Sequence, residues 1–161
     1  MSISRKVLES LNSLGVTLAA KPDFPIPTLP RDITELDDEA LMDLFVQFNQ
    51  WNNHLSDARA IAVINERDAD RSLETAEAEA MLASWAGSSK DRVAVSKASR
   101  AADPKVIELK EDVDTKYAFR KLIETRAEDV ERDSQVVSRE LTRRTSDYSG
   151  GFRARARKFT P

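Results

Sequence analysis

The residues best suited to chemistry lie at the C-terminal end, where arginine and phenylalanine are interleaved. From Arg139 to Pro161 there are seven basic residues and two acidic ones, a formal charge of +5, whereas the whole chain carries −3. An acidic body with a basic end is typical of chains that contact nucleic acid, because cations follow phosphates and aromatic rings stack on unpaired bases. We therefore predict a DNA-binding site formed by Arg139, Arg143, Arg144, Phe152, Arg153, Arg155, Arg157, Lys158 and Phe159.

Two alternatives stay open for this basic end: a solvated, disordered tail, or a contact within an oligomer. A second basic cluster lies in GSSKDRVAVSKASRAA, residues 87–102. Acidic residues dilute this cluster and it holds no aromatic residue, which favours a polar turn over a binding loop. A possible second DNA contact there would consist of Lys90, Arg92, Lys97 and Arg100.

The composition argues against an enzyme. The chain has no cysteine, which excludes disulfides, a thiol nucleophile and a cysteine-ligated zinc site, and fits a reducing cytoplasm. Its one histidine, His54, makes a catalytic triad or a histidine-rich metal site improbable, and no Gly-rich phosphate loop is present. The acidic run from Asp32 to Asp43 is typical of a solvated helix start. We predict no catalytic residue, no metal site and no cofactor.

The first long element is predicted to be a helix that begins near Asp37–Asp38. Acidic residues at that point suit both N-capping and the helix dipole. No Pro or Gly interrupts residues 38–86, and the apolar spacing alternates three and four residues, which indicates a heptad seam. The seam begins Leu41, Leu44, Phe48, Trp51, Leu55, Ala58, Ala62 and continues through Asn65, Ala69, Leu73, Ala76, Ala80 and Ala83.

A second long helix is predicted to start at Asp103–Pro104, with Asp as the N-cap and Pro in the first helical position. It should end near Thr145–Ser149, before the Gly150–Gly151 pair. Its seam is Val106, Leu109, Val113, Ile123, Ala127, Val130, Val137 and Leu141, with Lys116, Arg120 and Ser134 on the same frame. Tyr117, Phe119 and Leu122 offer an alternative register.

These elements predict an all-α fold: a long antiparallel, coiled-coil-like helical hairpin with a short N-terminal helix. The expected parts are a short amphipathic helix in 1–20, a Pro-rich linker in 21–36, the hairpin in 37–147 and a basic flexible tail in 148–161. The alanine-rich part of the seam buries little area, so we expect a homo-oligomer. Its predicted interface is Leu44, Phe48, Trp51 and Leu55. No apolar run approaches the length of a membrane span or of a signal-peptide core.

The layout resembles phage recombination mediator proteins of the UvsY type over roughly residues 38–145. The resemblance is carried by FNQWNNHL (residues 48–55), the Ala/Glu-rich continuation, the charged connection and SRELTRR (residues 138–144). It implies a non-catalytic helical oligomer that binds single-stranded DNA, contacts the single-strand-binding protein and helps load a RecA-like recombinase. It also implies the cytoplasm of a phage-infected bacterial cell. The Pro-rich N-terminal extension and the Arg-rich tail depart from the pattern.

A different class of protein suits the same layout. A long hairpin with uneven charge is also expected of a phage structural, scaffolding or assembly-chaperone protein. Binding of single-stranded DNA, measured against salt concentration, separates the two interpretations.

Overall fold

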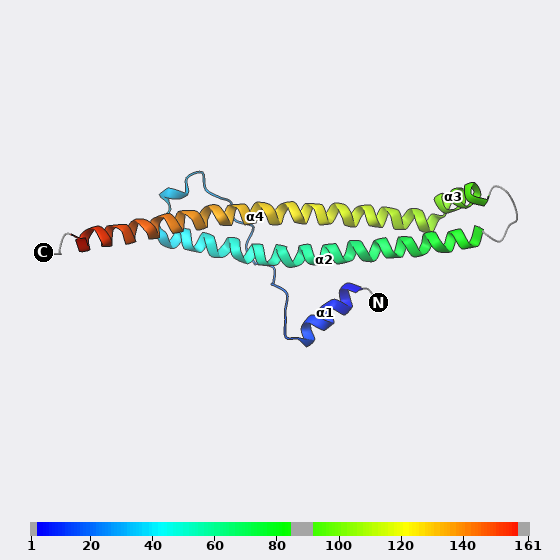
Figure 1. Cartoon of the computed structure of the whole chain (residues 1–161), viewed down its shortest axis with the longest axis horizontal. Helices are drawn as coiled ribbons and strands as arrows, with labels where there is room; N and C mark the ends of the chain where they lie inside the picture. Colours follow the sequence, from blue (N-terminus) through cyan, green and yellow to red (C-terminus); the bar gives the residue numbers. More distant parts are fainter. Residues whose placement is uncertain (1–2, 85–91, 158–161) are drawn as a thin grey trace. The chain divides into compact units, whose positions relative to one another are not determined.

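The computed structural model describes the backbone of residues 3–84 and 92–157, and the side chains of residues 5–83 and 97–146. Four α-helices and one short 3-10 helix occur in this part of the chain, and no strand does (Figure 1). The elements are α1 (Ile3–Ser13), η1 (Ile33–Glu35), α2 (Asp38–Ser84), α3 (Arg92–Ala102) and α4 (Pro104–Arg157). The two long helices, α2 and α4, pack antiparallel as a hairpin, which confirms the predicted fold class.

Local hydrogen bonds place three helix ends where the sequence predicts them: the starts of α2 and α4 and the end of α1. Asp37 caps α2, since its Oδ1 accepts from the backbone N–H of Ala40 at 2.7 Å. Asp103 caps α4 in the same way, with its Oδ1 accepting from the N–H of Lys105 at 2.8 Å. Gly15 closes α1 with a φ of +72°, in the left-handed region that favours glycine, and its N–H donates to the carbonyl of Asn12 at 3.0 Å.

The chain divides into two compact units, each built from parts of α2 and α4. The unit of Leu18–Ser56 and Thr125–Pro161 has an apolar core. The buried residues of this core are Leu41, Phe48, Trp51 and Leu55 from α2 and Ala127, Val130 and Val137 from α4. The non-helical segment before α2 also packs on this core, through the partly buried side chains of Phe24, Leu29, Ile33 and Leu36. We call residues 18–36 the N-terminal arm.

The sequence predicts part of this arm as a linker, and its four prolines do keep it out of an α-helix. The structure adds that the arm is part of this core, because the side chains of Phe24, Leu29, Ile33 and Leu36 pack against the buried residues of α2 and α4. His54 of α2 also meets the arm, where its Nδ1 lies 3.0 Å from the carbonyl oxygen of Ala19. The single histidine therefore packs against backbone.

The other unit, Met1–Thr17 and Asp57–Glu124, has a seam of small side chains supported by ion pairs. Ala62, Ala69, Ala76 and Ala80 are buried, and Val106 of α4 is fully buried. Arg120 pairs with Glu66 between the two helices, and Arg59 pairs with Glu124 at 2.7 Å. These polar side chains reach across the hairpin where alanine leaves little apolar area to bury.

The register predicted for α4 is confirmed. Val106, Ala127, Val130, Ser134 and Val137 are buried, and the other seam positions through Leu141 are at least partly buried. The alternative register fails, since Tyr117, Phe119 and Leu122 are about half or more exposed.

Two features of the helices differ from the sequence prediction: the end of the second long helix and the presence of a helix in the connection. The predicted end of the second helix at Thr145–Ser149 is wrong, because α4 continues through Gly150–Gly151 to Arg157. Glycine inside a helix costs only about 1 kcal/mol relative to alanine, and the alternating Arg and Ala that follow are strong helix formers. The connection contains an unpredicted helix, α3, whose alanines favour helix and which only Asp103 separates from α4. The predicted turn at Gly87–Ser89 lies outside the described residues.

In the described part of the chain, no helix is both long enough and apolar enough to cross a membrane.

Candidate nucleic-acid interface

The described part of the predicted site lies on the last turns of α4 whose side chains the structure describes. Arg139 is exposed and makes no ion pair with any described residue. Arg143 is 57% exposed and binds Glu140 through two hydrogen bonds, from Nε at 2.8 Å and from Nη2 at 2.7 Å. Both guanidinium groups are therefore accessible from solvent, and only that of Arg143 is held by a neighbouring acid.

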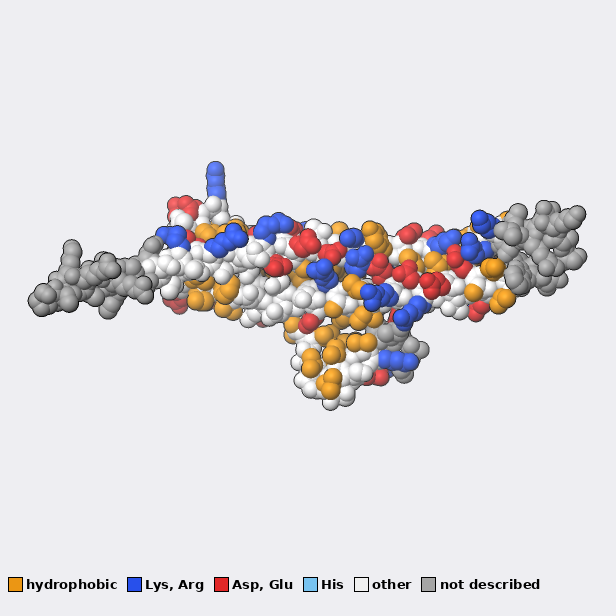
Figure 2. All heavy atoms as spheres, in the orientation of Figure 1, with side chains coloured by type: hydrophobic (Ala, Val, Ile, Leu, Met, Phe, Trp, Pro, Cys, Tyr) orange, Lys and Arg blue, Asp and Glu red, His pale blue; other side chains and the backbone are white. Residues whose placement is uncertain are grey.

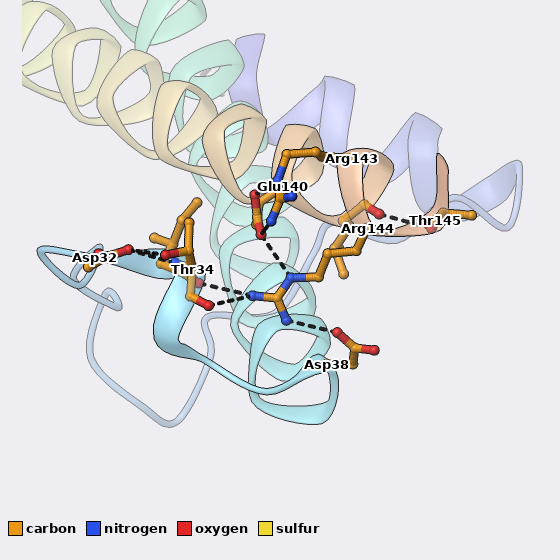
Figure 3. Close-up of polar contacts among 9 residues, drawn as sticks. Asp32, Thr34, Asp38, Glu140, Arg143, Arg144 and Thr145 are labelled. Carbon is orange, nitrogen blue, oxygen red and sulfur yellow. Dashed lines mark hydrogen bonds and ion pairs between the residues drawn. The ribbon is translucent and has the colours of Figure 1, made fainter. Parts of the chain in front are cut away.

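Arg144 differs from these two arginines, because its guanidinium is enclosed by protein (Figure 3). Its Nε donates to Glu140 Oε1 at 2.8 Å, and its Nη1 donates to Asp38 Oδ1, also at 2.8 Å. Its Nη2 faces the carbonyl oxygens of Thr34 and Ile33 at 3.1 and 3.4 Å. Arg144 thus joins α4 to the first residue of α2 and to η1, and its side chain is only 15% exposed. We call this cluster the Arg144 clasp.

The signal for this burial is present in the sequence. Position 144 follows Val137 and Leu141 by seven and three residues, so it falls on the heptad frame of the α4 seam. A charged residue at such a position must find partners within the protein. The sequence does not say which partners, since Asp38 is 106 residues away along the chain.

Hydrogen bonds hold two carboxylates near Arg144 in their charged form, those of Glu140 and Asp32. Hydrogen bonds from Arg143 and Arg144 lower the pKa of Glu140 to about 2, although only 7% of Glu140 is exposed. The hydroxyl and the backbone N–H of Thr34 donate to Asp32 Oδ1 at 2.6 and 2.9 Å, which lowers the pKa of Asp32. Asp38, with the help of Glu140, raises the pKa of Arg144.

The rest of the predicted site lies outside the side chains that the structure describes. This applies to Phe152, Arg153, Arg155, Arg157, Lys158 and Phe159. The backbone is described as far as Arg157, and Phe152, Arg153, Arg155 and Arg157 continue α4, whereas Lys158 and Phe159 lie outside the described residues.

Of the second predicted contact, Arg100 is paired with an acid of α2, as are two cations of α4 that follow it in the chain. Arg100 Nη1 lies 3.5 Å from Glu77 Oε2, and Lys110 Nζ lies 3.7 Å from Glu77 Oε1. Lys105 donates to Glu79 at 2.8 Å, which raises its pKa. Acidic and basic side chains are interspersed along the face of the hairpin shown in Figure 2. Lys97 is exposed, whereas the side chains of Lys90 and Arg92 lie outside the described residues.

The residues predicted as an oligomer interface are already covered within one chain. Phe48 is fully buried, Trp51 and Leu55 are 7% and 5% exposed, and Leu44 is partly buried against the same core. The arm and α4 supply the covering side chains, so this cluster presents little surface to a second copy. The described residues include no group of three or more acidic or histidine side chains placed to hold a metal ion.

No protein-family model matches this chain, and searches of curated proteins and of solved structures found no match.

Proposed function

We propose that this protein is a non-catalytic DNA-binding protein whose site for single-stranded DNA is the C-terminal end of α4. The observation that carries the proposal is the continuity of α4 from Arg139 to Arg157. A continuous helix rises about 1.5 Å per residue, so positions 139 and 153 lie roughly 21 Å apart along its axis. This distance is long enough for several phosphates of an extended strand to meet cations of one helix.

The charge distribution supports the same site. Arg139 and Arg143 are exposed, and the segment that follows adds four basic residues and a single acid. Of the two described cations of the connection, Arg100 is paired with Glu77 and Lys97 is exposed. Acidic residues dominate the remainder of the sequence and repel a polyanion there.

The resemblance to recombination mediators suggests the biological role. In this proposal the protein acts as a homo-oligomer in the cytoplasm, contacts a single-strand-binding protein and helps load a RecA-like recombinase. DNA binding is the part of the proposal that substitutions in the C-terminal end of α4 can test directly.

A salt titration of fluorescent oligo-dT binding tests the site. Replacement of the four tail cations with Gln should make the slope of log affinity against log salt shallower by roughly 3 units, at about 0.7 per phosphate contact. The matched control replaces four exposed cations elsewhere, Lys21, Arg31, Arg67 and Arg71, with Gln. Both variants lose the same charge, so equal slopes in the two would contradict the site.

Stacking is tested separately by replacing Phe152 and Phe159 with Ala. Each lost base stack should cost about 1–3 kcal/mol of binding free energy and leave the salt slope nearly unchanged. An intact chain that binds no oligo-dT at low salt would refute DNA binding and favour the phage structural or assembly role.

A further inference from the structure

The Arg144 clasp places protein acceptors where a phosphate would otherwise bind. A carboxylate oxygen of Asp38 and the carbonyl oxygens of Ile33 and Thr34 meet two nitrogens of the Arg144 guanidinium. Phosphate oxygens use the same donors in the same planar geometry. The clasp therefore satisfies Arg144 internally, next to the exposed Arg139 and Arg143.

The clasp is also open to competition from solvent. The Asp38 side chain is 60% exposed, although that of Arg144 is 15% exposed. An ion pair with one exposed partner stabilises a protein little, and salt screens it. A polyanion that already binds Arg139 and Arg143 reaches the next residue of the helix at a high effective concentration.

We propose that the segment Asp32–Asp38 is an internal competitor of single-stranded DNA that holds Arg144 back from the cationic face of α4. This inference rests on the proposed function. Bound DNA displaces Asp38 and adds Arg144 to its contacts, and displacement also loosens η1 from α4. Because η1 is part of the N-terminal arm, DNA binding and packing of the arm oppose each other.

The test compares Asp38→Asn with Asp43→Asn in fluorescent oligo-dT titrations against salt. Both variants remove one negative charge from the start of α2, but only Asp38 pairs with Arg144. We expect Asp38→Asn to bind more tightly than the control and to steepen the salt slope by about 0.7, the value for one added phosphate contact. Adding Arg144→Gln to Asp38→Asn should return the slope to that of the unmodified chain.

The outcomes separate this inference from the proposed function. If the unmodified chain binds oligo-dT and the two Asn variants have equal affinities and slopes, the competitor role is wrong and DNA binding stands. If none of the chains binds at low salt, both fail. If Asp38→Asn gains affinity and Arg144→Gln does not abolish the gain, a general loosening of the arm is responsible and the role of Arg144 is refuted. Circular dichroism of each variant verifies that its helices are intact.

Discussion

At the scale of single residues, Glu140 holds the side chains of Arg143 and Arg144 on the last described turns of α4. It receives hydrogen bonds from Arg143 and Arg144 and is almost fully buried. A carboxylate in this position must stay charged, since a protonated one would leave two guanidinium groups without their partner. The formal charge of +5 at this end already counts Glu140, and Asp38 of α2, which pairs with Arg144, further lowers the positive charge that a ligand meets.

The lowered pKa of Glu140 predicts how stability depends on pH. Because the pKa falls from an ordinary 4.5 to about 2 in the folded chain, the stabilisation by Glu140 is complete above about pH 4.5. It is lost as the pH falls from there toward 2. We expect Glu140→Gln to lower the melting temperature at pH 7 and the difference from the unmodified chain to shrink toward pH 2.

Melting followed by circular dichroism checks this prediction. Glu128→Gln, which removes one charge from an exposed position of the same helix, controls for the change in net charge. A melting difference for Glu140→Gln that stays constant from pH 7 to pH 2 would contradict the assigned role.

At the scale of elements, the N-terminal arm is structural although its sequence is typical of a linker. Proline excludes α-helix geometry, and four apolar side chains of the arm, Phe24, Leu29, Ile33 and Leu36, pack against the core formed by α2 and α4. Helix α1, which precedes the arm, contributes none of its described side chains to this core. Its apolar residues Val7, Leu8 and Leu11 are half-buried, and Leu14 is 75% exposed.

Two truncations distinguish the arm from α1. Deleting residues 1–17 should leave the unfolding of the core around Trp51 nearly unchanged. Deleting residues 1–36 should destabilise it by about 1 kcal/mol for each lost half-buried side chain of the arm, because full burial of such a side chain is worth about 1.5–3 kcal/mol. Denaturant titrations with Trp51 fluorescence, in chains that carry Trp85→Phe, provide the measurement. Equal stability of the two truncated chains would show that the arm is only a linker.

At the scale of the whole molecule, the buried seam residues of α2 and α4 pack against each other within one chain. Each long helix covers the apolar stripe of the other, and two polar seam residues of α4, Arg120 and Ser134, find partners on α2. Among the described side chains of α4, the exposed large apolar residues lie off the seam, at Ile107, Tyr117, Phe119 and Leu122. Self-association must therefore use surfaces other than the one predicted from the heptads.

The homo-oligomer stays a prediction, but we now expect its contacts to involve the exposed apolar residues of α4 and not the buried seam residues of α2. We expect light scattering at micromolar concentration to give a mass above that of one chain. Combined Phe119→Ser and Leu122→Ser should lower this mass, because both side chains are more than half exposed and can be changed without opening the core. Arg67→Ser and Arg71→Ser, exposed on α2, serve as the control. A monodisperse monomer of the unmodified chain would refute the prediction.

The sequence by itself determined the two long helices, their N-caps and the seam frames. These follow from hydrogen bonds between near neighbours and from the spacing of apolar residues, as at Asp37, Asp103 and Gly15. Only the tertiary structure decided that Arg144 is enclosed by partners from α2 and η1, and that the N-terminal arm packs on the core. Asp38 and Arg144 are separated by 106 positions and meet because the hairpin brings the start of α2 beside α4. Charge counted along a chain cannot reveal which charges neutralise each other, since that depends on distance in space.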